Sequence, residues 1–296
     1  MSLLHPLAAA AVAALAGPAG LGALATALLG ASRDHGKPFG LVIHAFTRRS
    51  PLDCSHVGPQ ILDTLLCMSG AVSWQTVRAA ASATAGPTAG SSGPARVLTF
   101  DDGLEEVYTA GLPLLEKNGV KATVFAVAGC IGSRSDAGDV YGRQRFLSAG
   151  QLREIAELGH EIGSHSMTHP DLTLLDTASA RQELADSRRL IEDTVGRPVT
   201  SIAFPFGSWN RRLWALAQES GYTAATALRP AMGVLPERMI RVYGTHAFDT
   251  AADLAAVVRR DGAPLVHARA RVMSQFARGG PLWRFRSGYR VTGPRF

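Results

Sequence analysis

Two pairs of polar side chains in this sequence have the types and the spacing that metal-assisted chemistry requires. Asp101 and Asp102 are adjacent carboxylates that follow the apolar run Val97–Phe100. His165 and His169 are four residues apart and follow a second short strand-like stretch. Two neutral imidazoles and a carboxylate form a ligand set that suits Zn²⁺ and related divalent ions. Because neighbouring strand residues point to opposite sides, one acid can hold a cation while the other handles a proton.

Three segments together resemble the polysaccharide deacetylases of carbohydrate esterase family 4. Thr99–Gly103 matches the family's Asp-Asp motif in full, and His165–His169 matches its H-[ST]-x-x-H motif. Ala203–Phe206 matches a third motif, R-x-P-[YF], except that alanine stands in place of the arginine. Each of the first two motifs alone is a weak signal, but both in this order, within about residues 40 to 245, are specific.

The resemblance implies a role for each motif residue. Asp102, His165 and His169 would hold one divalent metal ion, most readily Zn²⁺, with Co²⁺ or Mn²⁺ as alternatives. Asp101 would be the general base that takes a proton from the attacking water. The backbone N–H of Phe206 would donate to the oxyanion that forms during the reaction.

His44 is the candidate general acid. It ends the strand-like run Leu41-Val42-Ile43-His44, which resembles a motif that most family members carry late in the chain. In a circularly permuted branch, which resembles poly-N-acetylglucosamine deacetylases, that strand comes first, and this sequence is similar to that branch. His246 follows a late strand as the unpermuted motif would, but no Leu-x-Leu run precedes it. A buried core histidine is the alternative interpretation of His44.

Three further residues are weaker candidates for the site. Pro205 adjoins the oxyanion donor, and Trp209, like Phe206, could offer an apolar face to a sugar ring, although an aromatic residue near a strand end is more often part of a core. Arg241, on a late strand, is a candidate replacement for the arginine that Ala203 displaces. An ordinary solvated arginine is an equally good interpretation of it.

The elements that must position these residues alternate between strands and helices. Strands are predicted near residues 39–46, 97–100, 122–127, 161–164, 199–204, 223–227 and 240–243. Helices are predicted near 62–68, 104–117, 149–158, 178–194, 211–220 and 251–259, with 72–81 as a strand or short helix. Such alternation indicates a parallel α/β sheet, and with the family resemblance it predicts a distorted, incomplete (β/α) barrel of the polysaccharide deacetylase type.

Composition and charge divide the 296 residues into three parts. Residues 1–36 are an apolar segment, with no Asp, Glu, Lys or Arg from Leu3 to Leu29, which could be a membrane anchor, a signal or an Ala-rich helix. Residues 37–262 are the predicted catalytic domain. Residues 263–296 form a tail with seven arginines and no acid, which could lie on an anionic membrane or pack on the domain. The cellular location stays open between the membrane or envelope and the cytoplasm.

The overall composition excludes several classes of protein. A hydrophobic content of 46% and a charged content of 18% exclude a disordered chain. No basic stripe interleaved with aromatic residues supports nucleic-acid binding. Three cysteines without a C-x-x-C pair exclude a zinc–thiolate site.

The sequence therefore predicts a metal-dependent hydrolase that removes N-acetyl groups from a polysaccharide or a lipid-linked sugar. The alternatives are an O-acetyl-carbohydrate esterase and a catalytically silent glycan-binding domain of the same fold.

Overall fold

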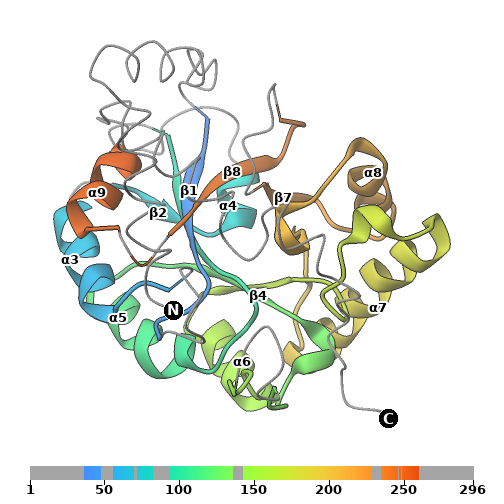
Figure 1. Cartoon of the computed structure of the whole chain (residues 1–296), viewed down its shortest axis with the longest axis horizontal. Coiled ribbons are helices and arrows are strands. Elements are labelled where there is room, and N and C mark those ends of the chain that lie inside the picture. Colours follow the sequence, from blue (N-terminus) through green and yellow to red (C-terminus); the bar gives the residue numbers. More distant parts are fainter. Residues whose placement is uncertain are drawn as a thin grey trace, which may run out of the picture.

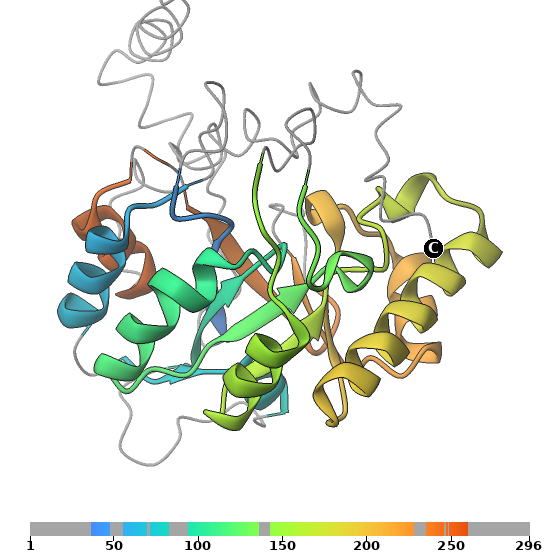
Figure 2. The same cartoon turned by 90° about the horizontal axis from the view of Figure 1, so that it is seen from below.

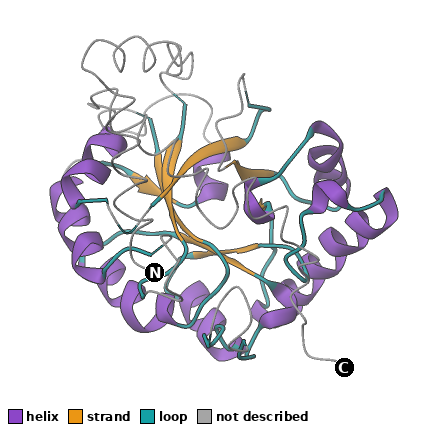
Figure 3. Cartoon of the chain, in the orientation of Figure 1, coloured by secondary structure: helices purple, strands orange, loops and turns teal. Residues whose placement is uncertain are grey.

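Seven parallel strands form a closed ring at the centre of the structure, a computed structural model that describes residues 37–47, 56–69, 72–82, 94–135, 143–227, 235–245, 247 and 249–259 (Figures 1 and 3). The strands β3 to β8 pair in chain order, and β1 closes the ring by pairing with both β3 and β8. The short strand β2 pairs with the first residues of β3. The strands are β1 (Phe39–Ile43), β2 (Trp74–Gln75), β3 (Arg96–Phe100), β4 (Thr123–Ala126), β5 (Glu161–Ser164), β6 (Ser201–Ala203), β7 (Ala224–Ala227) and β8 (Met239–Gly244).

Helices surround this ring. Figures 1 and 2 show α3 and α9 together on one side of the strands, with α7 and α8 together on the opposite side. A π-helical turn, Val107–Gly111, leads directly into α5, and short 3₁₀ turns follow β4, the His165–His169 segment and β6. The helices are α3 (Pro59–Ser69), α4 (Val77–Ser82), α5 (Leu112–Lys117), α6 (Ala149–Glu157), α7 (Thr177–Val195), α8 (Arg211–Glu219) and α9 (Ala251–Arg259).

The alternation of side chains along each strand separates two cores. One set of strand residues packs outward against the helices and forms the large core, which includes Leu41, Leu98 and Ile202. The other set forms a smaller cluster made from six of the ring strands together with residues of α4, namely Val42, Val77, Ala80, Val97, Phe125, Ala203, Ala224, Ile240 and Val242. This cluster fills the ring, so the ring is packed and is not an open pore.

Capping residues define both ends of α7, which lies where the sequence predicts a helix. Asp176 accepts a hydrogen bond from the backbone N–H of Ser179 at 2.8 Å, and Gly196 ends the helix in the left-handed conformation.

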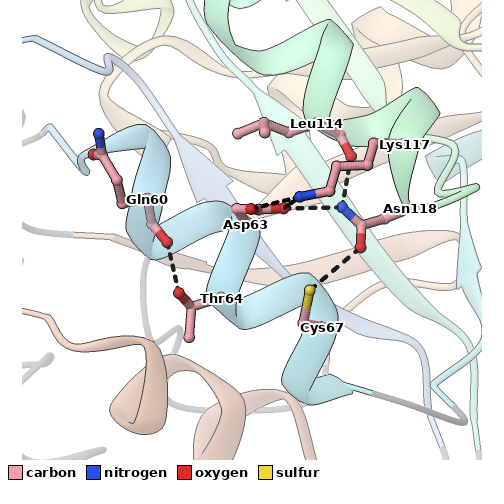
Figure 4. Close-up of polar contacts among 7 residues, drawn as sticks. All are labelled: Gln60, Asp63, Thr64, Cys67, Leu114, Lys117 and Asn118. Carbon is pink, nitrogen blue, oxygen red and sulfur yellow. Dashed lines mark hydrogen bonds and ion pairs between the residues drawn. The ribbon is translucent and has the colours of Figure 1, made fainter.

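The α3–α5 contact is polar at its edge. Figure 4 shows Asp63 of α3 accepting hydrogen bonds from Lys117, at 2.8 Å, and from Asn118, at 3.3 Å. The Lys117 hydrogen bond lowers the pKa of the Asp63 carboxyl. These contacts join the unit that follows β1 to the unit that follows β3.

The predicted barrel class is confirmed, and most predicted elements are present with shifted ends. Two regions differ. The expected helix 104–117 begins instead with the π-helical turn, and Pro113 lies in the first turn of α5, directly after that turn. Residues 72–81, left open between strand and helix, contain both β2 and most of α4.

The predictions for the apolar segment 1–36, for the basic tail 263–296 and for His246 concern residues outside the described part of the chain. Within the described part, no helix is both long and apolar enough to cross a membrane.

Gly163 marks the tightest point inside the ring near the histidine motif. A Cβ atom there would lie 2.5 Å from the Phe125 ring and 2.7 Å from Ser201 Oγ. We expect Gly163→Ala to lower the free energy of unfolding by about 1–3 kcal/mol, the usual cost of an overpacked core. Chemical denaturation would measure this change. Gly150→Ala is the control, because its Cβ would meet only Ser148 Oγ, at 3.9 Å. Unchanged stability in Gly163→Ala would show that the interior of the ring can accommodate the added methyl group, which would contradict this expectation.

Candidate active site

The side-chain alternation inside the ring places three of the predicted site residues at its mouth. Val42 points into the ring, and His44 follows it two residues later, just beyond β1. Asp101 and His165 each lie an even number of residues after an inward-facing position of β3 or β5, so they point to the same side as those positions. All of the ring strands are parallel, so these residues leave the sheet at the same end. In parallel barrels this carboxyl end is where functional groups collect.

Asp102, His165 and His169 form a compact group of potential metal ligands, and all three are buried. The Asp102 Oδ1 atom lies 3.5 Å from the Nε2 atoms of both histidines. One ligand atom from each residue lies within 4.8 Å of the others. The predicted triad is therefore brought together by the fold. Its donor set and spacing fit one divalent ion, because a buried carboxylate facing two imidazole nitrogens needs a compensating charge.

Contacts around the triad fix the orientation of its members. The Nδ1 atom of His165 is 2.7 Å from the Ala203 carbonyl oxygen, so Nδ1 donates to that oxygen and Nε2 is the nitrogen that faces Asp102. The His169 backbone N–H donates to Ser166 Oγ at 3.0 Å. Asp102, Ser166 and His169 all have positive φ angles, between 61° and 72°. Such strain in non-glycine residues persists only where the surroundings hold it, and it commonly marks functional sites.

Asp101 is a buried carboxyl group beside the triad. Its backbone N–H donates to the Ile43 carbonyl at 3.1 Å, and its Oδ1 atom has no hydrogen-bond partner among the described residues. Burial raises the pKa of Asp101, while the nearby His165 and His44 oppose that shift and Asp102 adds to it. An acid with an unpartnered oxygen in this position can accept a proton from a water molecule in the mouth of the ring.

His44 lies beside Asp101. Ile43 pairs in register with Phe100, so the two following residues leave neighbouring strands side by side. His44 also opposes the rise in the pKa of Asp101 that burial causes. His44 is half-buried, and its Nδ1 atom has no hydrogen-bond partner in the described structure. The fold therefore brings His44 to the site. Within the described part of the chain, its Nδ1 atom lacks the hydrogen bond expected of a histidine buried in a core.

Phe206 has a strained backbone and contacts the triad. Its φ angle is 59°, and its ring meets the His169 ring edge-on, with centroids 4.7 Å apart. Pro205 is buried at the start of the same 3₁₀ turn. Trp209 is only partly exposed and packs against the large outer core. Phe206 is thus at the site, whereas the proposed sugar-facing role of Trp209 competes with this packing.

The structure does not bring Arg241 to Asp101. Arg241 pairs with Phe39 at the start of β1, whereas Asp101 follows the residue that pairs with Ile43 at its end. Ile240 and Val242 point into the ring, so Arg241 between them points outward. Arg241 therefore does not replace the motif arginine.

Comparison with known proteins agrees with this geometry. Residues 89–225, from just before β3 into β7, match the polysaccharide deacetylase family. This segment is therefore similar to the polysaccharide deacetylases. The family match begins after β1, and in the structure β1 closes the ring between β3 and β8, as the permuted interpretation requires.

Curated proteins similar to this chain include YxkH of Bacillus subtilis, which is 31% identical over 51% of this chain and 49% of its own length. The peptidoglycan-N-acetylglucosamine deacetylase PgdA of Listeria monocytogenes is 31% identical over 42% of this chain and 23% of its length. The chain thus spans about half or less of the length of these curated relatives.

The fold matches solved deacetylase structures. The Streptococcus pyogenes deacetylase PplD, solved in complex with acetate, has a TM-score of 0.59 at 23% identity, covering 74% of this chain and 97% of PplD. IcaB from Ammonifex degensii has a TM-score of 0.58 at 20% identity, covering 76% of this chain and 97% of IcaB. At such identities the likeness establishes the fold alone.

Two carboxylates near the site were missed by the sequence interpretation. Glu106 hydrogen-bonds the segment after His44, and Glu183 hydrogen-bonds the segment between His165 and His169. Neither belongs to a motif, and no feature of the sequence distinguishes them from ordinary helix-surface acids.

Proposed function

We propose that this protein is a metal-dependent N-deacetylase of an acetylated glycan, either a polysaccharide or a lipid-linked sugar. The observation that carries the proposal is the buried triad of Asp102, His165 and His169 with Asp101 and His44 beside it. The relatives named deacetylases support the substrate class. Zn²⁺ is the favoured ion for one carboxylate and two imidazoles, with Co²⁺ and Mn²⁺ as alternatives.

The reaction hydrolyses an amide. A divalent ion bound by the triad would supply a Lewis acid and lower the pKa of water, as such ions do in other hydrolases. Asp101 accepts a proton from the water whose oxygen bonds to the acetyl carbon. The Phe206 N–H donates to the carbonyl oxygen as it gains negative charge. His44 donates a proton to the amide nitrogen as the C–N bond breaks, which leaves acetate and a free amine.

Released acetate distinguishes the candidate activities. We expect the protein with added Zn²⁺ or Co²⁺ to release acetate from N-acetylated oligosaccharides, and Asp101→Asn to lower this rate by roughly 10²–10⁴-fold, the range for a positioned base. Activity on O-acetylated xylan alone would identify an O-acetyl esterase instead.

A silent glycan-binding domain is the second candidate, and Ala203 is the residue that favours it. The motif arginine, which orients the base in the family that the sequence resembles, is absent there. Glycan binding without any acetate release, at saturating Zn²⁺, Co²⁺ or Mn²⁺, would support this candidate.

A further inference from the structure

Glu106 accepts three hydrogen bonds from the segment that follows His44. Its Oε1 atom accepts the backbone N–H of Phe46 at 2.8 Å, and its Oε2 atom accepts the backbone N–H of Thr47 at 3.1 Å and Thr47 Oγ1 at 2.8 Å. Glu106 stands four residues after Asp102, at the start of the π-helical turn. One carboxylate thus ties the chain beyond β1 to the chain beyond β3, within a few residues of His44 and Asp102.

Glu183 makes the same pattern of contacts on the other side of the site. It projects from α7 and accepts the backbone N–H groups of Met167 and Thr168, at 2.9 and 3.0 Å, and Thr168 Oγ1 at 2.6 Å. Met167 and Thr168 lie between the two histidines of the triad. In both places a carboxylate accepts two consecutive backbone N–H groups and the hydroxyl of the threonine.

Such contacts can set the positions of the reacting groups. Hydrogen bonds to an ionised acceptor are roughly twice as strong as neutral ones. The segments they hold are irregular backbone, and around Glu183 both Ser166 and His169 are in the strained left-handed region. A displacement of about 1 Å at a reacting group can cost about 100-fold in rate, so the anchoring of these segments bears on activity.

We propose that Glu106 and Glu183 are positioning residues for separate halves of the site. Glu106 positions the general acid His44, and Glu183 positions the metal ligands His165 and His169. The proposal rests on the function proposed above. Its two halves can be tested separately, because Glu183 contacts the segment between two metal ligands, whereas Glu106 contacts the segment that follows His44.

The two glutamine variants should have different phenotypes, one in metal binding and the other in turnover. Each keeps one acceptor oxygen but turns an NH₂ group toward a backbone or hydroxyl donor. We expect Glu183→Gln to bind Zn²⁺ about 10–100-fold more weakly in a chelator competition, the usual cost of losing a contact behind a metal ligand. We expect Glu106→Gln to bind Zn²⁺ like the wild type but to lose about 100-fold in kcat, with KM little changed.

Matched variants separate positioning from general destabilisation. Thr47→Ser and Thr168→Ser keep the hydroxyl and should behave like the wild type, whereas Thr47→Val and Thr168→Val should move in the direction of the corresponding glutamine variants. Glu219→Gln removes an exposed carboxylate that pairs with Arg181 on α7, and it should change neither Zn²⁺ affinity nor kcat.

Amide hydrogen exchange tests the contacts without any need for activity. Exchange should accelerate at Phe46 and Thr47 in Glu106→Gln, and at Met167 and Thr168 in Glu183→Gln. If the wild type releases no acetate, the proposed function fails, while exchange and Zn²⁺ affinity still test the positioning. Equal loss of Zn²⁺ affinity in both variants, or normal kcat in Glu106→Gln, would overturn the division between the two carboxylates.

Discussion

His165→Ala and Asp102→Asn are expected to abolish metal retention by a protein that otherwise holds about one divalent ion per chain. Each substitution removes one of three buried ligand groups whose atoms lie within 4.8 Å of one another. Losing a residue behind a ligand typically costs about 10–100-fold in affinity, so losing a ligand should cost more than about 100-fold. Elemental analysis of the purified proteins, with chelator competition for Zn²⁺, measures both occupancy and affinity.

Folding and specificity need controls in this experiment. The circular dichroism spectrum of each variant should match that of the wild type with its metal removed. Cys67→Ser removes an exposed thiol on α3 that is a potential adventitious ligand, and it should leave occupancy unchanged. Full occupancy in His165→Ala would show that the ion binds elsewhere, and the assignment of the triad would then be wrong.

The triad could be predicted from the sequence because short-range information determines most of it. The H-x-x-x-H spacing keeps two ligands within one loop, and Asp102 closely follows β3, which is parallel to the strand before that loop. Parallel strands present their carboxyl ends on one side, so motifs at those ends converge. The capped helix α7 was predictable for a similar reason, since Asp176 and Gly196 act on their immediate neighbours.

Arg241 and the two glutamates were not predictable because their positions depend on neighbours that are distant in the sequence. The register of β8 against β1, and the inward direction of Ile240 and Val242, decide that Arg241 faces away from the site. The partners of Glu106 are backbone N–H groups about 60 residues away, which have no side-chain signature in a sequence. An acid on a helix surface has the same appearance in a sequence whether it binds water or fastens a loop.

The histidine of the first strand tests whether strand order and mechanism agree in this protein. β1 is first in the chain, yet it closes the ring between β3 and β8, so His44 emerges beside Asp101. A proton donor there lies beside the base, at the same mouth of the ring, where it could protonate the departing amine. We expect His44→Ala to lower kcat by roughly two to four orders of magnitude, the usual contribution of a positioned acid.

The control measurements make this result specific to proton donation. Metal content and the unfolding transition of His44→Ala should match those of the wild type, because His44 is outside the triad and its Nδ1 atom has no hydrogen-bond partner in the described structure. The basic limb of the pH–rate profile should disappear, since that limb reports loss of the protonated acid. His246→Ala, which removes the competing candidate, should keep the wild-type rate. Normal turnover in His44→Ala, with the loss in His246→Ala, would assign the general acid to the chain beyond β8. His44, just beyond β1, would then have no catalytic role.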